Sequence, residues 1–182
     1  MKKYEFTGET KRVELWNRTA TLHRIKATVE FGFVKVGELG GWIEKEENLS
    51  HEGKAWVCGD AKVWGNAKVC GDAEVWGNAE VCGDAEVWGN AKVWGNAEVC
   101  GDAEVFLASH VLVMGSVGSR NDFTTFFRDK DNEITVKCGC FLGKIDKFLE
   151  KVTQTHGNNK YALVYRAAVE VAKLQIELTE RK

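Results

Sequence analysis

The central part of the chain repeats one pattern of apolar and polar positions. From residue 55 to residue 105 the six-residue phrase Ala-x-Val-x-Gly-(Asn/Asp) occurs nine times without an insertion, and Gly-Asn or Gly-Asp closes every phrase up to Asp102. Alternate side chains of a β-strand point to opposite faces, so the alanine and valine of each phrase share one face. Glycine, asparagine and aspartate tolerate the left-handed backbone of a sharp corner. The pattern therefore predicts a parallel β-helix, a solenoid with alanine and valine inside.

The outward position after each valine varies between cysteine, tryptophan and, at the end, phenylalanine. The cysteines at this position are Cys58, Cys70, Cys82 and Cys100, and the tryptophans are Trp64, Trp76, Trp88 and Trp94. Monomeric proteins rarely leave large aromatic patches bare. We therefore expect these tryptophans beneath the chain's own terminal segments or at an oligomer interface, where tryptophan is enriched.

The phrase also resembles the hexapeptide repeat of left-handed β-helix proteins. That resemblance implies three phrases per triangular coil, so that residues 18 positions apart stack, and a homotrimer formed through one face of the prism. On this register three stacks join opposite charges, namely Lys62 with Glu80, Lys68 with Glu86, and Lys92 with Glu74. The next coil sets Glu98 over Glu80 and Glu104 over Glu86 instead. Cys82 and Cys100 also stack, but a disulfide between them is not expected in a reducing cytoplasm.

The segments on either side of the repeat have a different character. Residues 1–54 contain short alternating stretches that predict strands, followed by a glycine-rich stretch at 37–53 that is out of hexad register and is expected to cap the solenoid. Residues 55–117 form the repeat block, which decays through Val111 and Val117. Residues 118–182 make up a C-terminal part. The chain is thus expected to be mainly β, one solenoid with two appended segments.

The C-terminal part predicts a β-hairpin followed by two α-helices. Strand-like stretches at 123–128 and 133–138 flank turn residues at 129–132. One helix is predicted at 144–155, and Asn158 or Asn159 can cap a second that continues to about residue 180. The residues expected on its apolar stripe are Tyr161, Val164, Tyr165, Ala168, Val171, Ala172 and Leu178. This stripe is expected to pack on a face of the prism or on the same helix of a neighbouring subunit.

Composition and charge narrow the class of protein. The 182 residues are 44% hydrophobic with a net charge of −2, and acids and bases are interspersed, which argues against electrostatic binding of nucleic acid. No apolar run approaches the roughly 20 residues of a membrane span, and no apolar segment follows residues 1–5 as it would in a secretory signal. A cytoplasmic protein without a membrane partner is expected.

The flanks resemble a more specific group of proteins. The segments are Gly-Glu-Leu-Gly-Gly-Trp-Ile-Glu-Lys-Glu-Glu-Asn-Leu-Ser at 37–50, Gly-Ser-Arg-Asn-Asp at 118–122 and Cys-Gly-Cys-Phe-Leu-Gly at 138–143. They are similar to segments of bacterial and prophage proteins that are often labelled transferases. That group has no clear activity, so the resemblance implies an architecture and a phage origin and does not imply a reaction.

The two tail segments supply the candidate binding residues. These are Ser119, Arg120, Asp122, Phe126, Cys138, Cys140 and Phe141. An arginine can bind phosphate or carboxylate in bidentate fashion, a phenylalanine can stack on a base, and Cys140 is small enough to line a pocket. The structural alternative is that Arg120 pairs with Asp122 or Asp129 and only fixes the hairpin. Cys138, Cys140 and His156 are a weak zinc motif because structural zinc sites bring four ligands in paired spacings, so no metal is expected.

Two functions remain for the chain. Many hexapeptide-repeat proteins are acyl-coenzyme A-dependent acyltransferases with a histidine base, but this repeat block contains no histidine and no inserted loop. His51 and His110 only bracket it, His156 lies in the tail, and a general base must reach its substrate. The interpretation we favour is a non-enzymatic, cofactor-free binding protein of phage type that captures a host protein or a small anionic, nucleotide-like ligand and counteracts a host defence. An acyltransferase is the alternative.

Overall fold

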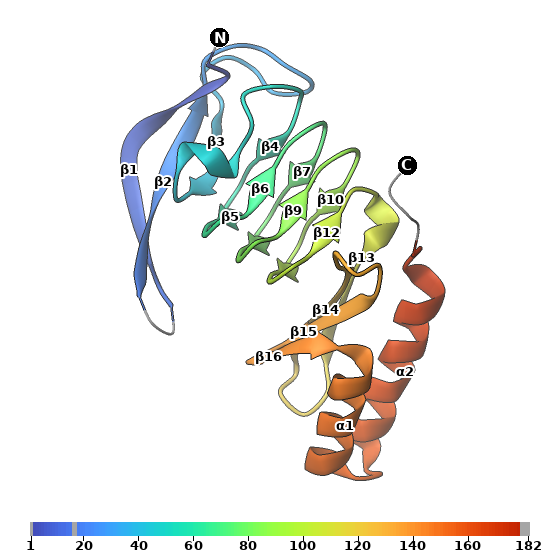
Figure 1. Ribbon diagram of the computed structural model, residues 1–182. Coiled ribbons are helices and arrows are strands. Elements are labelled where there is room, and N and C mark those ends of the chain that lie inside the picture. The colour runs from blue at the N-terminus through green and yellow to red at the C-terminus, as the bar shows by residue number, and fades with distance from the viewer. Residues whose placement is uncertain (1, 16–17, 179–182) are drawn as a thin grey trace.

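A computed structural model describes residues 2–15 and 18–178, which form a mainly β protein with two α-helices. A β-solenoid of about four turns occupies the centre, with an N-terminal hairpin at one end and a C-terminal sheet and the helices at the other (Figure 1). Nine two-residue strands build its rungs: β4 (Trp56–Val57), β5 (Lys62–Val63), β6 (Lys68–Val69), β7 (Glu74–Val75), β8 (Glu80–Val81), β9 (Glu86–Val87), β10 (Lys92–Val93), β11 (Glu98–Val99) and β12 (Glu104–Val105).

The strand pairing confirms the predicted register of 18 residues. Strand β5 pairs with β8 in parallel so that Val63 faces Val81, and the same spacing joins the other neighbouring rungs. The three predicted opposite-charge stacks are present, with nitrogen–oxygen distances of 2.6 Å for Lys62–Glu80, 3.9 Å for Lys68–Glu86 and 3.8 Å for Lys92–Glu74. The glutamate stacks of the last coil are present as well.

The interior and corners of the solenoid follow from the phrase. Every alanine and valine of the nine phrases is at most 1% exposed, so the tube is filled by small and branched side chains in alternation. Glycine is required at the corners for two reasons. At Gly83, for example, φ is +71°, and a Cβ atom would lie 2.8 Å from the backbone nitrogen of Gly101 in the next coil.

The N-terminal segment continues one face of the solenoid beyond its first coil. Strands β1 (Tyr4–Glu14) and β2 (Thr19–Ala27) form an antiparallel hairpin, and β2 pairs with β3 (Leu39–Ile43). Strand β3 in turn pairs in parallel with β5, so six strands form one continuous sheet in the order β1-β2-β3-β5-β8-β11. A short 3-10 turn, Glu46–Asn48, leads onward, and the Asn48 amide donates to the carbonyls of Gly65 and Ala67. The predicted capping coil therefore bonds directly to the first repeats.

The C-terminal part is a four-stranded antiparallel sheet, of which only the central hairpin was predicted. Its strands, in sequence order and in sheet order, are β13 (Val111–Val117), β14 (Asp122–Arg128), β15 (Ile134–Cys138) and β16 (Phe141–Lys144). A 3-10 turn, Ala108–His110, separates the sheet from the solenoid. Residues 111–117 were predicted to belong to the end of the repeat block. That prediction is wrong, because these residues pair antiparallel with β14 in the C-terminal sheet.

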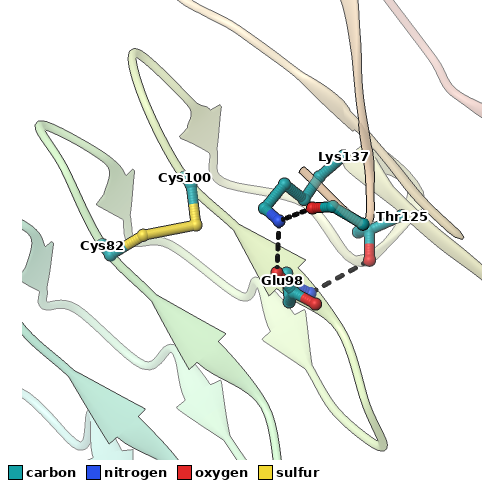
Figure 2. Close-up of a disulfide and its surroundings, with 6 residues drawn as sticks. Cys82, Glu98, Cys100, Thr125 and Lys137 are labelled. Atoms are coloured by element: carbon teal, nitrogen blue, oxygen red, sulfur yellow. Dashed lines mark hydrogen bonds and ion pairs between the residues drawn. A yellow bond between two sulfur atoms is a disulfide. The ribbon is translucent and has the colours of Figure 1, made fainter. Parts of the chain in front are cut away.

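The C-terminal sheet covers the end of the solenoid and forms ion pairs with two glutamates of the last coil. Lys137 lies 2.7 Å from the Glu98 carboxylate, and Arg128, only 3% exposed, lies 3.2 Å from that of Glu104. Figure 2 shows Thr125 and Lys137 reaching Glu98, where the Thr125 hydroxyl accepts from the Glu98 backbone N–H at 3.0 Å. Glu98 and Glu104, which stack on other glutamates in the preceding coil, thus bind the C-terminal sheet to the end of the solenoid.

Two helices cover the outer side of the C-terminal sheet (Figure 1). Helix α1 (Ile145–His156) lies within one residue of the predicted range 144–155, and Gly157, whose φ is +57°, caps its C-terminal end. Helix α2 (Lys160–Gln175) is capped by Asn159, whose side chain accepts from the N–H groups of Tyr161 and Ala162. The predicted end near residue 180 is too late, and residues 179–182 lie outside the described part of the chain.

The buried stripe of α2 differs from the predicted one. The residues that it buries are Ala162, Tyr165, Ala168, Val169 and Ala172. Val164 and Val171, placed on the inner stripe by the sequence, are 40% and 44% exposed. The stripe packs on the C-terminal sheet and α1, and the prediction that it packs on a prism face is wrong. The reason is that the sheet, which is longer than the expected hairpin, supplies a nearer apolar surface.

Candidate functional site

The two tail segments meet at one edge of the C-terminal sheet. The turn between β13 and β14 contains Gly118, and a Cβ atom there would lie 2.1 Å from the Tyr165 hydroxyl oxygen, so this turn rests against α2. In the same turn the Ser119 hydroxyl lies 3.3 Å from the Nε2 atom of His156, at the end of α1. The segment thus touches both helices, which fix its position.

The turn between β15 and β16 supplies the other side of the site. Gly139 has a φ of +57°, and a Cβ atom at this position would lie 3.1 Å from the Cζ atom of Arg120. The guanidinium therefore lies against the backbone of this turn. The Lys137 ammonium donates to the Gly139 carbonyl and so holds the turn in place. The predicted convergence of residues 119–122 with residues 137–141 is found around Arg120 and Gly139.

Arg120 is an exposed cation without an acidic partner. Within the described residues its guanidinium makes no ion pair or hydrogen bond at the usual distances. The Asp122 carboxylate accepts from the N–H of Phe123, and Asp129 is bound at 2.6 Å by Lys144. The structural alternative, in which Arg120 pairs with either aspartate, is therefore wrong. An unpaired, exposed guanidinium keeps its full capacity to bind an anion.

Of the other candidates, Phe126 has to be removed from the site. Its ring is 0% exposed and packs edge-on against Phe148, 6.4 Å away between centroids. It belongs to the core between the sheet and the helices and cannot stack on a ligand. Phe141 is half-buried, with its ring centroid 5.3 Å from that of Phe148, so only one side of it can face a ligand.

The two cysteines of the tail differ in their surroundings. Cys138 is half-buried and accepts a hydrogen bond from the Thr124 hydroxyl at 3.2 Å, whereas Cys140 is exposed at the turn. Burial, with the nearby Cys138, raises the pKa of the Tyr165 hydroxyl. Among residues 2–15 and 18–178 no group of three His, Cys, Asp or Glu side chains is arranged to hold a metal ion.

Tyr165 and His156 are the site residues that the sequence did not assign to binding. Tyr165 was predicted only as part of a packing stripe, and His156 only as a weak metal ligand or base. The structure stacks the two rings at 5.9 Å and places both beside Ser119. The sequence signal that points here is Gly118 ahead of Ser119, because a glycine can mark a turn or a close approach of the backbone. The structure gives Gly118 a φ of +74°. Nothing in the sequence identifies Tyr165 as the residue that it approaches.

Two of the histidines proposed as alternative bases are structural. His51 stacks on Tyr4 with ring centroids 4.3 Å apart, and its Nδ1 atom accepts the backbone N–H of Lys3. His110 is 0% exposed, and its Nδ1 atom accepts the N–H of Phe106 at 3.4 Å. Burial, and after it the Arg128 charge, lowers the pKa of His110 to about 4. Neither ring faces solvent freely enough to reach a substrate.

Figure 2 shows a disulfide on the outside of the solenoid, between Cys82 and Cys100. The two residues occupy the same position in adjacent coils, with Cα atoms 4.6 Å apart. The sequence analysis predicts free thiols at Cys82 and Cys100, because the cytoplasm is a reducing compartment. The rung spacing alone brings the two sulfur atoms together, so the pair lies in bonding position whatever the compartment. Cys58 and Cys70 remain free, and burial raises the pKa of the Cys58 thiol to about 11.

The four outward tryptophans differ in how far they are exposed. Trp64 is only 7% exposed because Ala20, Leu22 and Trp42 cover it, so its place in a predicted oligomer interface has to be given up. Trp88 is half-buried and stacks on Phe106, with centroids 5.0 Å apart.

Only one prism face leaves its tryptophans open. Trp76 is 38% exposed and Trp94 is 60% exposed, and their centroids lie 6.5 Å apart on neighbouring rungs. Phe33, 47% exposed, extends the row at 5.6 Å from Trp76. This row of three rings is the aromatic face of the solenoid.

No protein-family model matches this chain, and no curated protein sequence matches it. Within residues 2–15 and 18–178 no helix has the length and apolar character needed to cross a membrane. The geometry of the site is therefore the basis for assigning a function.

Proposed function

We propose that this chain is a non-enzymatic binding protein that captures an anionic partner, a small nucleotide-like ligand or a host protein, at the Arg120 edge of its C-terminal sheet. The observation that carries the proposal is the exposed guanidinium of Arg120, which no acidic side chain of the described chain neutralises. The Ser119 hydroxyl beside it adds a hydrogen-bond donor. A planar, always charged group held against a rigid turn suits bidentate recognition of phosphate or carboxylate.

The wider assignment rests on the hexad pattern and the motifs of the flanks. We propose a left-handed β-helix of the hexapeptide-repeat type, from a phage or prophage, acting in the cytoplasm of a bacterial host without a cofactor. Sequestering a host effector or its nucleotide signal would counteract a host defence. The pairing of residues 18 positions apart supports the triangular coil on which this assignment depends.

Of the three histidines considered as bases, His156 is the one that an acyltransferase could use at this site. His156 is the histidine that lies in the site, 3.3 Å from the Ser119 hydroxyl, and an acyltransferase that used this site would need it as the base. Replacing His156 with alanine would remove most of such a rate, because general bases contribute roughly 10²- to 10⁴-fold. Under the binding proposal, incubation with acetyl-coenzyme A and amine or sugar acceptors yields no turnover at all.

Replacing Arg120 with alanine is expected to weaken binding of an anionic nucleotide by about 1.5–3 kcal/mol, the contribution of a charge-assisted hydrogen bond. Isothermal titration with a panel of cyclic mono- and dinucleotides measures this. Arg12→Ala removes an equally charged, exposed arginine on β1 and should leave the affinity unchanged. Equal affinity of Arg120→Ala and the unaltered protein for every nucleotide that binds would show that this arginine is not the anion site.

We also propose that the aromatic face of the solenoid forms the interface of a homotrimer. Exposed tryptophans are typical of binding hot spots, and this row is the one left open by the terminal segments. Replacing Trp94 with lysine should therefore reduce the molar mass in solution threefold by light scattering. Phe6→Lys, which alters an exposed aromatic residue on β1, should not change it. A mass of one chain for the unaltered protein at micromolar concentration would contradict the trimer.

A further inference from the structure

Cys82 and Cys100 occupy the same outward position on adjoining rungs of one prism face, with Cα atoms 4.6 Å apart. Residues 18 positions apart stack, and at that distance the other two outward cysteines, Cys58 and Cys70, each meet a tryptophan of the next coil. Within the repeat block, residues 55–105, the pair is therefore the place where two thiols can join neighbouring coils.

The pair joins the last two rungs of its sheet. Cys82 directly follows β8 and Cys100 directly follows β11, which ends the order β1-β2-β3-β5-β8-β11. In β8 the N–H of Glu80 donates to the Ala97 carbonyl of the next coil at 2.8 Å. In the described chain no rung follows β11 in this sheet, and the corresponding N–H, that of Glu98, donates to the Thr125 hydroxyl instead. The last rung is thus held by one ladder and by the C-terminal sheet.

The C-terminal sheet docks on this same rung. Glu98 accepts the Lys137 ammonium at 2.7 Å, besides its backbone contact with Thr125. Figure 2 shows these contacts beside the bond between Cys82 and Cys100. A covalent tie here fixes the strand to which the sheet is bound. It therefore opposes local opening of the last coil, which would release the sheet with it.

The coils stack without needing that tie. The N–H of Cys82 donates to the Val99 carbonyl at 3.0 Å, and Val81 and Val99 are fully buried beside it. The oxidised and reduced forms therefore share one fold and differ in how firmly the last rung is held. Cys82 is half-buried whereas Cys100 is 6% exposed, so Cys82 carries the sulfur that a thiolate from solvent reaches.

We propose that Cys82 and Cys100 form a thiol–disulfide switch that ties the last coil down when glutathione disulfide is abundant and releases it when reduced glutathione is abundant. The inference concerns the stability of the C-terminal sheet and does not use the anion site proposed above. In a reducing cytoplasm the pair is open, and it closes as glutathione disulfide accumulates.

The exchange balances in two steps. A glutathione thiolate attacks the Cys82 sulfur, the bond to Cys100 breaks, and Cys100 leaves as a thiolate that takes a proton from water. A second glutathione thiolate then attacks the glutathione sulfur of the mixed disulfide. Cys82 leaves as a thiolate and is protonated in turn, and one glutathione disulfide is formed. Closing the switch runs the same steps in reverse and consumes one glutathione disulfide for two thiols oxidised.

The test compares the full-length protein in excess glutathione disulfide and in excess reduced glutathione. The oxidised form should melt about 6–12 °C higher, because the bond closes a loop of 18 residues and so restricts the unfolded chain. Amide hydrogen exchange, followed by mass spectrometry, should be slower in peptides that span β11 and β14. Alkylation of free thiols in the same samples reports whether the pair is open or closed.

Matched cysteine variants separate this pair from the other thiols. Cys82→Ser and Cys100→Ser should each abolish both differences, whereas Cys58→Ser, which changes an outward cysteine of the first coil, should retain them. A pair that stays closed in excess reduced glutathione, or open in excess glutathione disulfide, would overturn the inference. Equal hydrogen exchange of β11 in the open and closed forms would overturn it as well. These measurements involve no nucleotide, so their outcome is separate from that of Arg120→Ala.

Discussion

Replacing Val81 with aspartate is expected to unfold the solenoid cooperatively, lowering the free energy of unfolding by about 3–5 kcal/mol. Val81 is 0% exposed and lies between Val63 and Val99 on the adjoining rungs, so a carboxylate there would be buried without a partner. The loss is large compared with the roughly 5–15 kcal/mol that holds a typical domain folded. Urea denaturation followed by tryptophan fluorescence measures it.

The neighbouring residue on the same strand supplies the control. Glu80 points outward, and its ion pair with Lys62 is partly exposed, so Glu80→Gln should cost only about 0.2–1 kcal/mol. The two substitutions differ by one position along β8. Equal losses would mean that the assignment of inward and outward positions is wrong.

Replacing Asp129 with alanine is expected to cost about 3 kcal/mol and to loosen the C-terminal sheet from the solenoid. The carboxylate is 4% exposed and accepts four hydrogen bonds, from the backbone N–H groups of Asp131 and Glu133, the Thr135 hydroxyl and the Lys144 ammonium. The backbone of Asp129 also bridges to Ala103 at the last coil. Removing the side chain leaves several donors unsatisfied in a buried place.

Asp131→Ala is the matched control for this change. Asp131 contacts the same Lys144 ammonium at 3.2 Å but is 60% exposed, so its loss should cost under about 1 kcal/mol. Both variants are compared by chemical denaturation, with near-ultraviolet circular dichroism to follow the C-terminal aromatic core. A cost for Asp131→Ala as large as that for Asp129→Ala would show that the surface ion pair, not the buried hydrogen bonds, holds this turn.

Between residues 55 and 105 the inward, outward and corner positions of the solenoid could be predicted to the residue, because each is specified locally, whereas the predicted end at residue 117 is too late. One phrase specifies its own inward and outward positions and its own corner, and the 18-residue stack then follows from three phrases per coil. Whether each outward side chain is buried or exposed could not be predicted in this way. Trp64 and Trp94 occupy identical positions in the phrase, yet one is buried under β2 and the other is open, because the covering hairpin lies far away in sequence.

The C-terminal sheet was predicted only in part, for a related reason. Strand β14 is buried on both faces: Phe127 joins the solenoid core, and Phe126 joins the core beneath the helices. Alternating side chains show which residues of a strand share a face, but they do not show whether that face is covered by other parts of the chain. Phe126 was therefore wrongly predicted to contact a ligand. The pairing of β13 with β14 gave no periodic signal, whereas Arg120 was found from its residue type and loop context.

The central claim, capture of an anionic partner through Arg120, is tested most directly by identifying what the protein retains when purified from its native host. Native mass spectrometry of the unaltered protein and of Arg120→Ala, prepared side by side, resolves both small molecules and bound proteins. The proposal predicts an anionic nucleotide or a host protein on the unaltered chain and its loss from Arg120→Ala. Coenzyme A retained in stoichiometric amount by both proteins would contradict it and would favour the acyltransferase.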